Sequence, residues 1–163
     1  MLTLLLLLMA CEPTEPDPDL GPCEVGPDEM QTIDLSHYGD YGAIDAVIYC
    51  GTPPQGGAPY APFGVRIRGI NPDELGIELT MTAVDVDTGE EVGSGDYTQQ
   101  MICSNVGGNE GHWVGAELHM RFYGYELDAL HGRAVHMTVD ARNQSGDWVQ
   151  TEIDATLDCD PLS

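Results

Sequence analysis

An acidic segment between two predicted strands begins like a calcium-binding loop. It reads D-V-D-T-G from Asp85 to Gly89, which matches the D-x-D-x-G start of the EF-hand pattern. The full loop also needs a bidentate glutamate at its twelfth position, where this chain has Asp96. Asp-Thr-Gly is equally the composition of a tight hairpin turn with glycine at a positive φ. We therefore favour an acidic hairpin, with calcium binding near Asp85 and Asp87 as the alternative.

Two histidines and a glutamate on predicted strands are of the residue types that bind zinc. His119 and His136 lie on the polar faces of two strands that we expect to be neighbours, and Glu117 is in phase with His119. Period-two strands also bring such residues onto one face without any metal. We prefer that simpler interpretation and predict neither metal ligands nor a cofactor.

The sequence contains no recognisable nucleophile motif. It has no G-x-S-x-G segment, and its serines lie in predicted turns without a nearby histidine in the sequence. The glycine pairs at 93–95 and 107–108 have neither a strand-to-helix context nor the lysine of a phosphate-binding loop. We predict no catalytic residues and a protein that is not an enzyme.

The first cysteine follows a short apolar run. Residues 4–8 are all leucine, and Met9, Ala10 and Cys11 follow. The run is too short for a membrane-spanning helix, which needs about 20 residues, and it fits the apolar region of a signal peptide. The segment resembles the lipobox of bacterial lipoprotein signal peptides. The resemblance implies that residues 1–10 are removed and that Cys11 carries the lipid.

A proline-rich acidic segment follows Cys11. Residues 11–27 contain prolines at 13, 16, 18, 22 and 27, which favour extended polyproline II backbone. We interpret this segment as a tether that holds residues 28–163, one domain, away from a membrane surface. The expected location is the cell envelope, with a lipid anchor in a bacterial membrane. We expect the outer membrane, with the domain in the periplasm or at the cell surface.

The four remaining cysteines form an even set in an exported chain. They are Cys23, Cys50, Cys103 and Cys159, and an oxidising compartment favours two disulfides. Cys50 and Cys103 each end a predicted strand, and Cys23 and Cys159 flank the domain. We expect the pairs Cys50–Cys103 and Cys23–Cys159, with Cys23–Cys50 and Cys103–Cys159 as the alternative. A zinc site is the less favoured interpretation because no C-x-x-C pair occurs.

The charge of the chain is strongly one-sided. It has 28 acidic residues against 5 basic ones, for a net charge of −23, and every basic residue is an arginine. A phosphate backbone would be repelled, so we expect no nucleic-acid partner. Anionic lipid headgroups would also be repelled, which leaves the acyl chain as the means of attachment. Because the acidic residues are spread along the chain, we favour solubility over cation capture as their role.

Hydrophobic residues alternate with polar ones from about residue 30 onwards. Turn residues separate the runs, and one helical turn or a loop is expected near residues 125–131. About eight strands follow from this pattern, near residues 30–35, 43–50, 63–68, 77–83, 97–104, 113–123, 135–141 and 149–157. The pattern predicts an antiparallel β-sandwich of immunoglobulin-like type, with a small β-barrel as the alternative. Trp113, Tyr123 and Trp148 are out of phase with the apolar faces, so they are candidates for binding sugars or proteins.

Several motifs in a fixed order resemble a family. They are P-Q-G-G at 54–57, G-V-R-I-R-G at 64–69, D-T-G at 87–89 and L-H-G-R at 130–133. This set resembles uncharacterised lipoproteins of myxobacterial type, and the resemblance covers most of the chain from about residue 30. It implies an exported immunoglobulin-like domain and assigns no activity.

Two functions of different classes follow from these features. The first is a non-catalytic binding or structural module anchored to the cell envelope, with an envelope protein or a glycan as its partner. The second is an envelope hydrolase or carbohydrate-active enzyme that uses scattered Asp, Glu and His side chains. We favour the first because the sequence offers an anchor and a tether but no catalytic motif.

Overall fold

Almost all of the ordered elements are strands. The structure, a computed structural model, describes residues 23–24, 30–37, 44, 46–104 and 110–159, without the side chains of residues 37, 116 and 117. Its elements are β1 (Thr32–His37), β2 (Val47–Tyr49), β3 (Tyr60–Arg68), β4 (Ile77–Asp85), β5 (Glu91–Gln99), β6 (Ile102–Ser104), β7 (His112–Arg121), α1 (Leu127–Leu130), β8 (Ala134–Arg142) and β9 (Trp148–Asp158). The predicted all-β class is confirmed.

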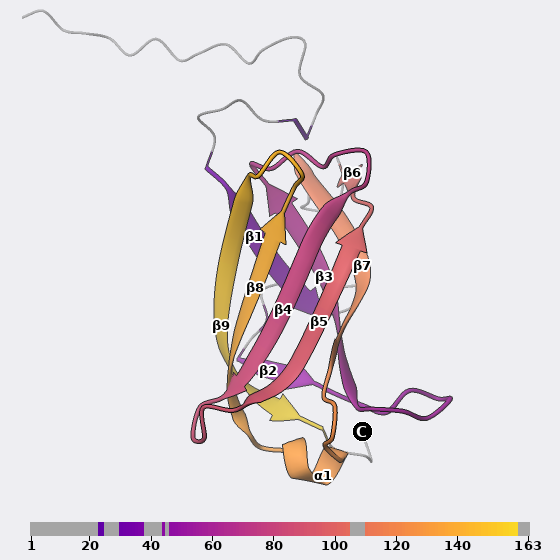
Figure 1. Cartoon of the computed structure of the whole chain (residues 1–163), viewed down its shortest axis with the longest axis vertical. Coiled ribbons are helices and arrows are strands. Elements are labelled where there is room, and N and C mark those ends of the chain that lie inside the picture. Colours follow the sequence, from indigo (N-terminus) through magenta and orange to yellow (C-terminus); the bar gives the residue numbers. More distant parts are fainter. Residues whose placement is uncertain (1–22, 25–29, 38–43, 45, 105–109, 160–163) are drawn as a thin grey trace, which may run out of the picture.

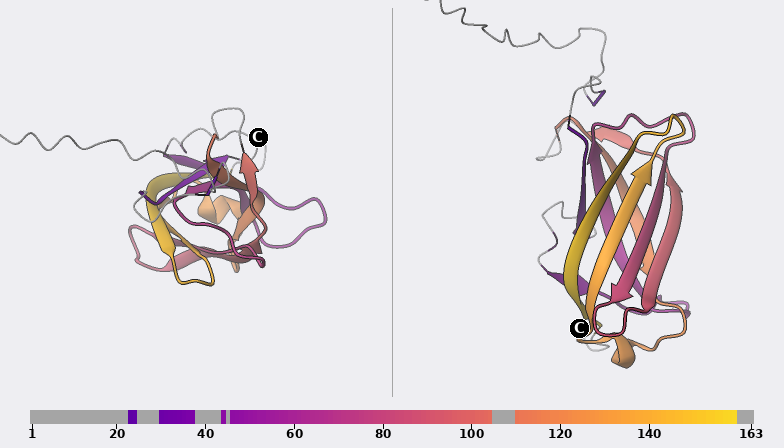
Figure 2. Two further views of the ribbon diagram at one scale, coloured as in Figure 1. Left: turned by 90° about the horizontal axis from the view of Figure 1, so that it is seen from above. Right: turned by 60° about the vertical axis from the view of Figure 1, so that its left-hand side comes forward.

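The strands form one curled sheet, which is a half-barrel (Figures 1 and 2). The strand order is β1-β3-β7-β5-β4-β8-β9-β2, with β6 paired to β7. Most pairs are antiparallel, but β2 runs parallel to β9, so the sheet is mixed. The expected antiparallel immunoglobulin-like sandwich is therefore not clearly present, and the curled sheet is nearer to the barrel alternative.

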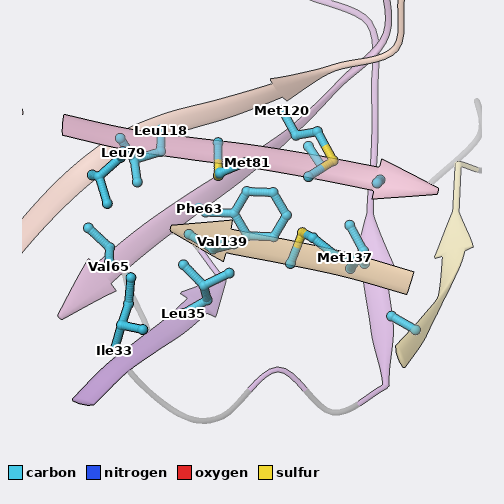
Figure 3. Close-up of a cluster of buried hydrophobic side chains, with 14 of the residues drawn as sticks. Ile33, Leu35, Phe63, Val65, Leu79, Met81, Leu118, Met120, Met137 and Val139 are labelled. Carbon is cyan, nitrogen blue, oxygen red and sulfur yellow. The ribbon is translucent and has the colours of Figure 1, made fainter. Parts of the chain in front are cut away.

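The alternation in the sequence places the core inside the curl. In β4, Ile77, Leu79, Met81 and Ala83 are buried, while the residues between them face outwards. β8 follows the same alternation. Figure 3 shows buried side chains from β1, β3, β4, β7 and β8 meeting around the ring of Phe63. Burying these apolar side chains is the main stabilising contribution to the fold.

A β-bulge in the β3–β7 pair changes the phase of β7. Phe63 pairs with Leu118 but Val65 pairs with Gly115, so the register shifts by one residue between the two pairs. Trp113, opposite the fully buried Ile67, consequently packs against the core. The expectation that Trp113 lies out of phase with the apolar face is wrong for this reason.

The junction between β5 and β7 is short, with a single register pair. Ser94 and Arg121 form its register pair. Beside it, the Tyr97 hydroxyl donates to the carbonyl oxygen of His119 and accepts the His119 N–H at 3.0 Å. Gly93 sits so close to the ring of Phe122 that a Cβ would lie 2.8 Å from it. The glycines at 93 and 95 therefore serve close packing within a strand.

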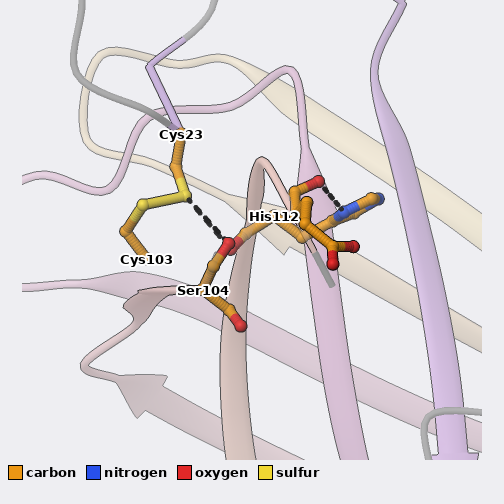
Figure 4. Close-up of a disulfide and its surroundings, with 5 residues drawn as sticks. Cys23, Cys103, Ser104 and His112 are labelled. Carbon is orange, nitrogen blue, oxygen red and sulfur yellow. Dashed lines mark hydrogen bonds between the residues drawn. A yellow bond between two sulfur atoms is a disulfide. The ribbon is translucent and has the colours of Figure 1, made fainter. Parts of the chain in front are cut away.

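The two disulfides lie at opposite ends of the half-barrel. Cys23 is linked to Cys103 beside β7, at the β6 end (Figure 4), with a Cα–Cα distance of 5.6 Å. Cys50 is linked to Cys159 with a Cα–Cα distance of 4.6 Å. Both pairings expected from the sequence, including the alternative set, are wrong in connectivity.

The strand directions explain this connectivity. Because β2 and β9 are parallel, the residues that follow them, Cys50 and Cys159, emerge side by side, and the Cys50 N–H donates to the Asp158 carbonyl at 2.9 Å. Cys103 lies in β6, opposite Trp113 at the other end of the barrel. Cys50 and Cys103 therefore do not meet.

Candidate functional site

The Asp85 carboxylate bonds to the backbone of its own hairpin and to Arg133. Its Oδ1 accepts the backbone N–H groups of Asp87 at 3.0 Å and Thr88 at 2.9 Å. Its Oδ2 forms an ion pair with Nη1 of Arg133 at 3.0 Å. Gly89 has a φ of 73°, as the predicted turn requires. This geometry favours the acidic hairpin over a calcium loop.

The pKa of Asp85 is lowered in the folded protein. The largest cause is the hydrogen bond from the Thr88 backbone, and the Thr88 hydroxyl, the Asp87 backbone and Arg133 act in the same direction. Arg133 is itself held by the Ala129 carbonyl at 2.6 Å and lies over the ring of Tyr125. Asp85 thus fastens the β4–β5 hairpin to the segment that contains α1.

Replacing Asp85 with asparagine is expected to lower the melting temperature at pH 7 by several degrees. Because folding lowers the pKa, the carboxylate stabilises the fold fully above its unfolded pKa of about 3.9. This contribution is lost as the pH falls through the folded pKa. Melting temperatures measured from pH 2 to 7 should therefore fall less steeply in acid for Asp85→Asn than for the parent.

The matched control is Asp87→Asn in the same hairpin. The Asp87 side chain is exposed, and the bond to Asp85 uses its backbone N–H, which asparagine retains. Its acid melting curve should follow that of the parent. Parallel curves for Asp85→Asn and the parent would contradict the role given to this carboxylate.

The two candidate zinc-binding histidines lie apart. β7 carries His119 and β8 carries His136, and β5 and β4 separate these strands in the sheet. The expectation that they are on neighbouring strands is therefore wrong. His119 packs edge-on against Tyr60, with ring centroids 4.8 Å apart. The side chain of Glu117 lies outside the described residues, and no cluster of three or more potential metal ligands occurs in the described part of the chain.

His136 instead pairs with carboxylates across the β8–β9 ladder. Its Nδ1 is 2.8 Å from Oδ1 of Asp154, and its Nε2 is 3.8 Å from Oε2 of Glu152. The hydrogen bond with Asp154 is the largest cause of a raised pKa for His136. The charged imidazole is therefore favoured on an acidic surface.

The side chain of Asn143 holds the turn between β8 and β9. Asn143 is buried, and its amide donates to the Asn71 carbonyl at 3.2 Å and to Asp147 Oδ2 at 2.9 Å. Its side-chain oxygen accepts the Asp147 N–H at 2.8 Å. These bonds fix the turn and attach it to the loop that contains Asn71.

The outward face of strands β5, β4, β8 and β9 carries a grid of polar side chains, which we call the Trp148 face. The ladder places residues from the four strands in rows that cross the sheet. The first row holds Thr98, Glu78, Arg142 and Trp148, and the second holds Asp96, Thr80, Asp140 and Gln150.

A shallow hollow lies at the β4–β5 side of the Trp148 face. Its volume is about 320 Å³, and Glu78 and Thr80 of β4 line it together with Asp96 and Thr98 of β5. These four side chains are exposed and offer carboxylate and hydroxyl oxygens to a bound molecule. The hollow is therefore suited to a polar ligand.

Trp148 is at the opposite side of the same face. Its side chain is 52% exposed, and it stands opposite Arg142, which in turn stands opposite Glu78. Neighbouring strands lie about 4.8 Å apart, so roughly 10 Å separates the β9 backbone from β4. An exposed aromatic ring and a polar hollow thus share one surface across two strand spacings.

The sequence identified some of these residues and missed others. Trp148 and Tyr123 are exposed, as their phase predicted. The polar members Glu78, Asp96 and Arg142 were missed, because the sequence does not reveal that β4 lies between β5 and β8. Cys11 lies outside the described residues.

Comparisons with protein-family models, with curated protein sequences and with solved structures returned no match. In the described part of the chain, no helix has the length and apolarity needed to cross a membrane.

Proposed function

We propose that the chain is a lipid-anchored lipoprotein of the bacterial cell envelope. Residues 1–10 act as the signal peptide, Cys11 carries the lipid, residues 11–27 form the tether and residues 28–163 form the displayed domain. The lipobox-like segment and the proline-rich sequence support this assignment. The two disulfides also fit an oxidising compartment such as the periplasm or the cell surface.

We propose a non-catalytic binding module as the function of this domain. The observation that carries the proposal is the attachment of Cys23, which lies within the proline-rich sequence, to β6 and β7. Cys23 is buried, and its sulfur lies 3.3 Å from the His112 carbonyl oxygen (Figure 4). The tether is therefore fastened through β6 and β7, whereas the Trp148 face is carried by other strands, namely β5, β4, β8 and β9. An envelope protein or a glycan is the partner class.

The proposal also covers the relation of this fold to known all-β folds. We infer a distant relation to immunoglobulin-like sandwiches, as the resemblance to myxobacterial-type lipoproteins implies. The short β5–β7 junction supports it, because that junction divides the curled sheet into a β1-β3-β7 part and a β5-β4-β8-β9 part. The parallel β2 is an addition to this plan.

Replacing Cys11 with serine is expected to move the protein from the membrane fraction to the soluble fraction. The cysteine sulfur is the atom that takes the lipid, and the hydroxyl of serine does not accept it. Cell fractionation followed by immunoblotting measures the distribution. The anchor proposal is wrong if Cys11→Ser stays in the membrane fraction as the parent does.

The control is the double variant Cys23→Ser with Cys103→Ser. It removes one disulfide and leaves Cys11 intact. This variant should remain in the membrane fraction. The comparison separates loss of the anchor from a general effect of removing cysteines.

A further inference from the structure

Trp148 offers a flat apolar surface bordered by hydrogen-bonding groups. Arg142 stands opposite it, and Gln150 follows two residues later on the same face. Gln150 Nε2 donates to Asp140 Oδ1 at 3.0 Å, which orients both side chains on the surface. A sugar ring has the matching chemistry, because its faces present C–H groups and its edge presents hydroxyls. Aromatic side chains bury such apolar faces while neighbouring polar groups pair with the edge.

The rest of the Trp148 face favours a glycan over a protein. Protein interfaces centre on clusters of buried aromatic and aliphatic anchors. Among the large apolar side chains that the described residues expose, Trp148 is the one on this face. The others are Met30, Tyr49, Leu75, Val86, Ile102 and Tyr123, and they belong to other strands or loops. A single aromatic platform among polar groups suits a ligand that is itself mostly polar.

The charge of the face restricts the class of glycan. The first two rows of the face hold three acidic side chains, Glu78, Asp96 and Asp140, and one basic side chain, Arg142. The whole chain has a net charge of −23. Anionic polysaccharides would therefore be repelled. Cationic polymers would be attracted to the entire molecule, so their binding would not depend on this face. The complementary ligand for this site is an uncharged sugar chain.

We propose that the Trp148 face binds a neutral glycan chain, with one ring on Trp148 and a later ring in the hollow at Glu78 and Asp96. This inference rests on the proposed function and supplies its ligand class. The roughly 10 Å from β9 to β4, the near side of the hollow, gives room for more than one sugar ring across the face. Carboxylates bind sugar hydroxyls by charge-assisted hydrogen bonds, which are stronger than neutral ones.

The test titrates the full chain in detergent with cellohexaose, maltohexaose and N-acetylchitohexaose. The chain contains two tryptophans, so intrinsic fluorescence reports on Trp148 once Trp113 is changed to phenylalanine. Calorimetry measures the affinity in parallel. We expect at least one hexasaccharide to bind and to shift the fluorescence of the Trp113→Phe variant.

Variants locate the binding. Trp148→Ala should weaken binding by about tenfold or more, because stacking and buried area contribute together. Asp96→Ala should weaken it by a similar factor, because it removes a charged acceptor. Tyr123→Ala and Asp87→Ala are the matched controls, an exposed aromatic and an exposed acid away from this face. Melting curves check that each variant is folded.

The outcomes separate this inference from the proposed function. The inference is overturned if none of the three sugars binds, or if binding survives Trp148→Ala unchanged. In that case, release of Cys11→Ser from the membrane would still support an anchored module with another ligand. If Cys11→Ser stays on the membrane while Trp148-dependent sugar binding is found, the glycan site stands and the anchor proposal fails.

Discussion

Replacing both Cys50 and Cys159 with alanine is expected to lower the free energy of unfolding by about 3–5 kcal/mol. The bridge closes a separation of 109 residues. For a loop of about 100 residues the chain-entropy model gives about 4.7 kcal/mol, and the overlapping Cys23–Cys103 bridge reduces this value. Domains are stable by about 5–15 kcal/mol, so the variant should keep only part of its stability.

Local structure adds to this effect. β2 contributes three residue pairs to the sheet, all with β9, and Cys50 continues this contact. Without the bridge, β2 is held by these pairs and by the Gly51–Tyr60 contact with β3. Urea unfolding followed by circular dichroism measures the loss. An unchanged midpoint would contradict the assigned bridge.

Peptide mapping of the non-reduced protein is the direct control. Cleavage at arginine leaves Cys23 and Cys50 on one fragment, because the first arginine is Arg66. A second cleavage at Glu24 separates them. We expect the Cys23 peptide to be linked to that of Cys103, and a Cys23–Cys159 peptide would contradict this connectivity.

The sequence predicted the strands better than their arrangement. Alternation is a local signal, so Ile77 to Ala83 and Val135 to Ala141 were identified as strands with the correct buried faces. The run expected at residues 97–104 is divided between β5 and β6, and Glu91 to Asp96 begins β5 with two glycines that weaken the pattern. The strand order depends on pairings far apart in the chain, which local periodicity does not encode.

The same limit applies to the disulfides and the candidate site. The four cysteines after Cys11 are all paired, but their partners depend on β2 being parallel to β9, and no local residue pattern indicates this direction. Trp148 was found because exposure follows from phase within one strand. Its neighbours across the sheet were missed, and His119 was placed beside His136, because both questions require the strand order.

Replacing Phe63 with alanine is expected to lower the free energy of unfolding by about 3–5 kcal/mol. The ring is fully buried at the centre of the half-barrel, where Met81, Met120 and Val139 surround it (Figure 3). Truncation removes its apolar contacts and leaves a cavity, which is the usual source of losses of this size. Methionine side chains are flexible and fill part of such a space, so the lower half of the range is expected.

Tyr123→Ala is the matched control for this truncation. It also removes an aromatic ring, but that ring is 65% exposed, so the loss should stay within about 0.5 kcal/mol. Phe63→Leu should lie between the two, because leucine keeps most of the buried apolar area. Denaturant unfolding of the three variants gives the series. Equal losses for Phe63→Ala and Tyr123→Ala would mean that the concave side of the sheet does not enclose the core. The opposite, outward face would then also be wrongly assigned, and with it the row that contains Glu78, Arg142 and Trp148.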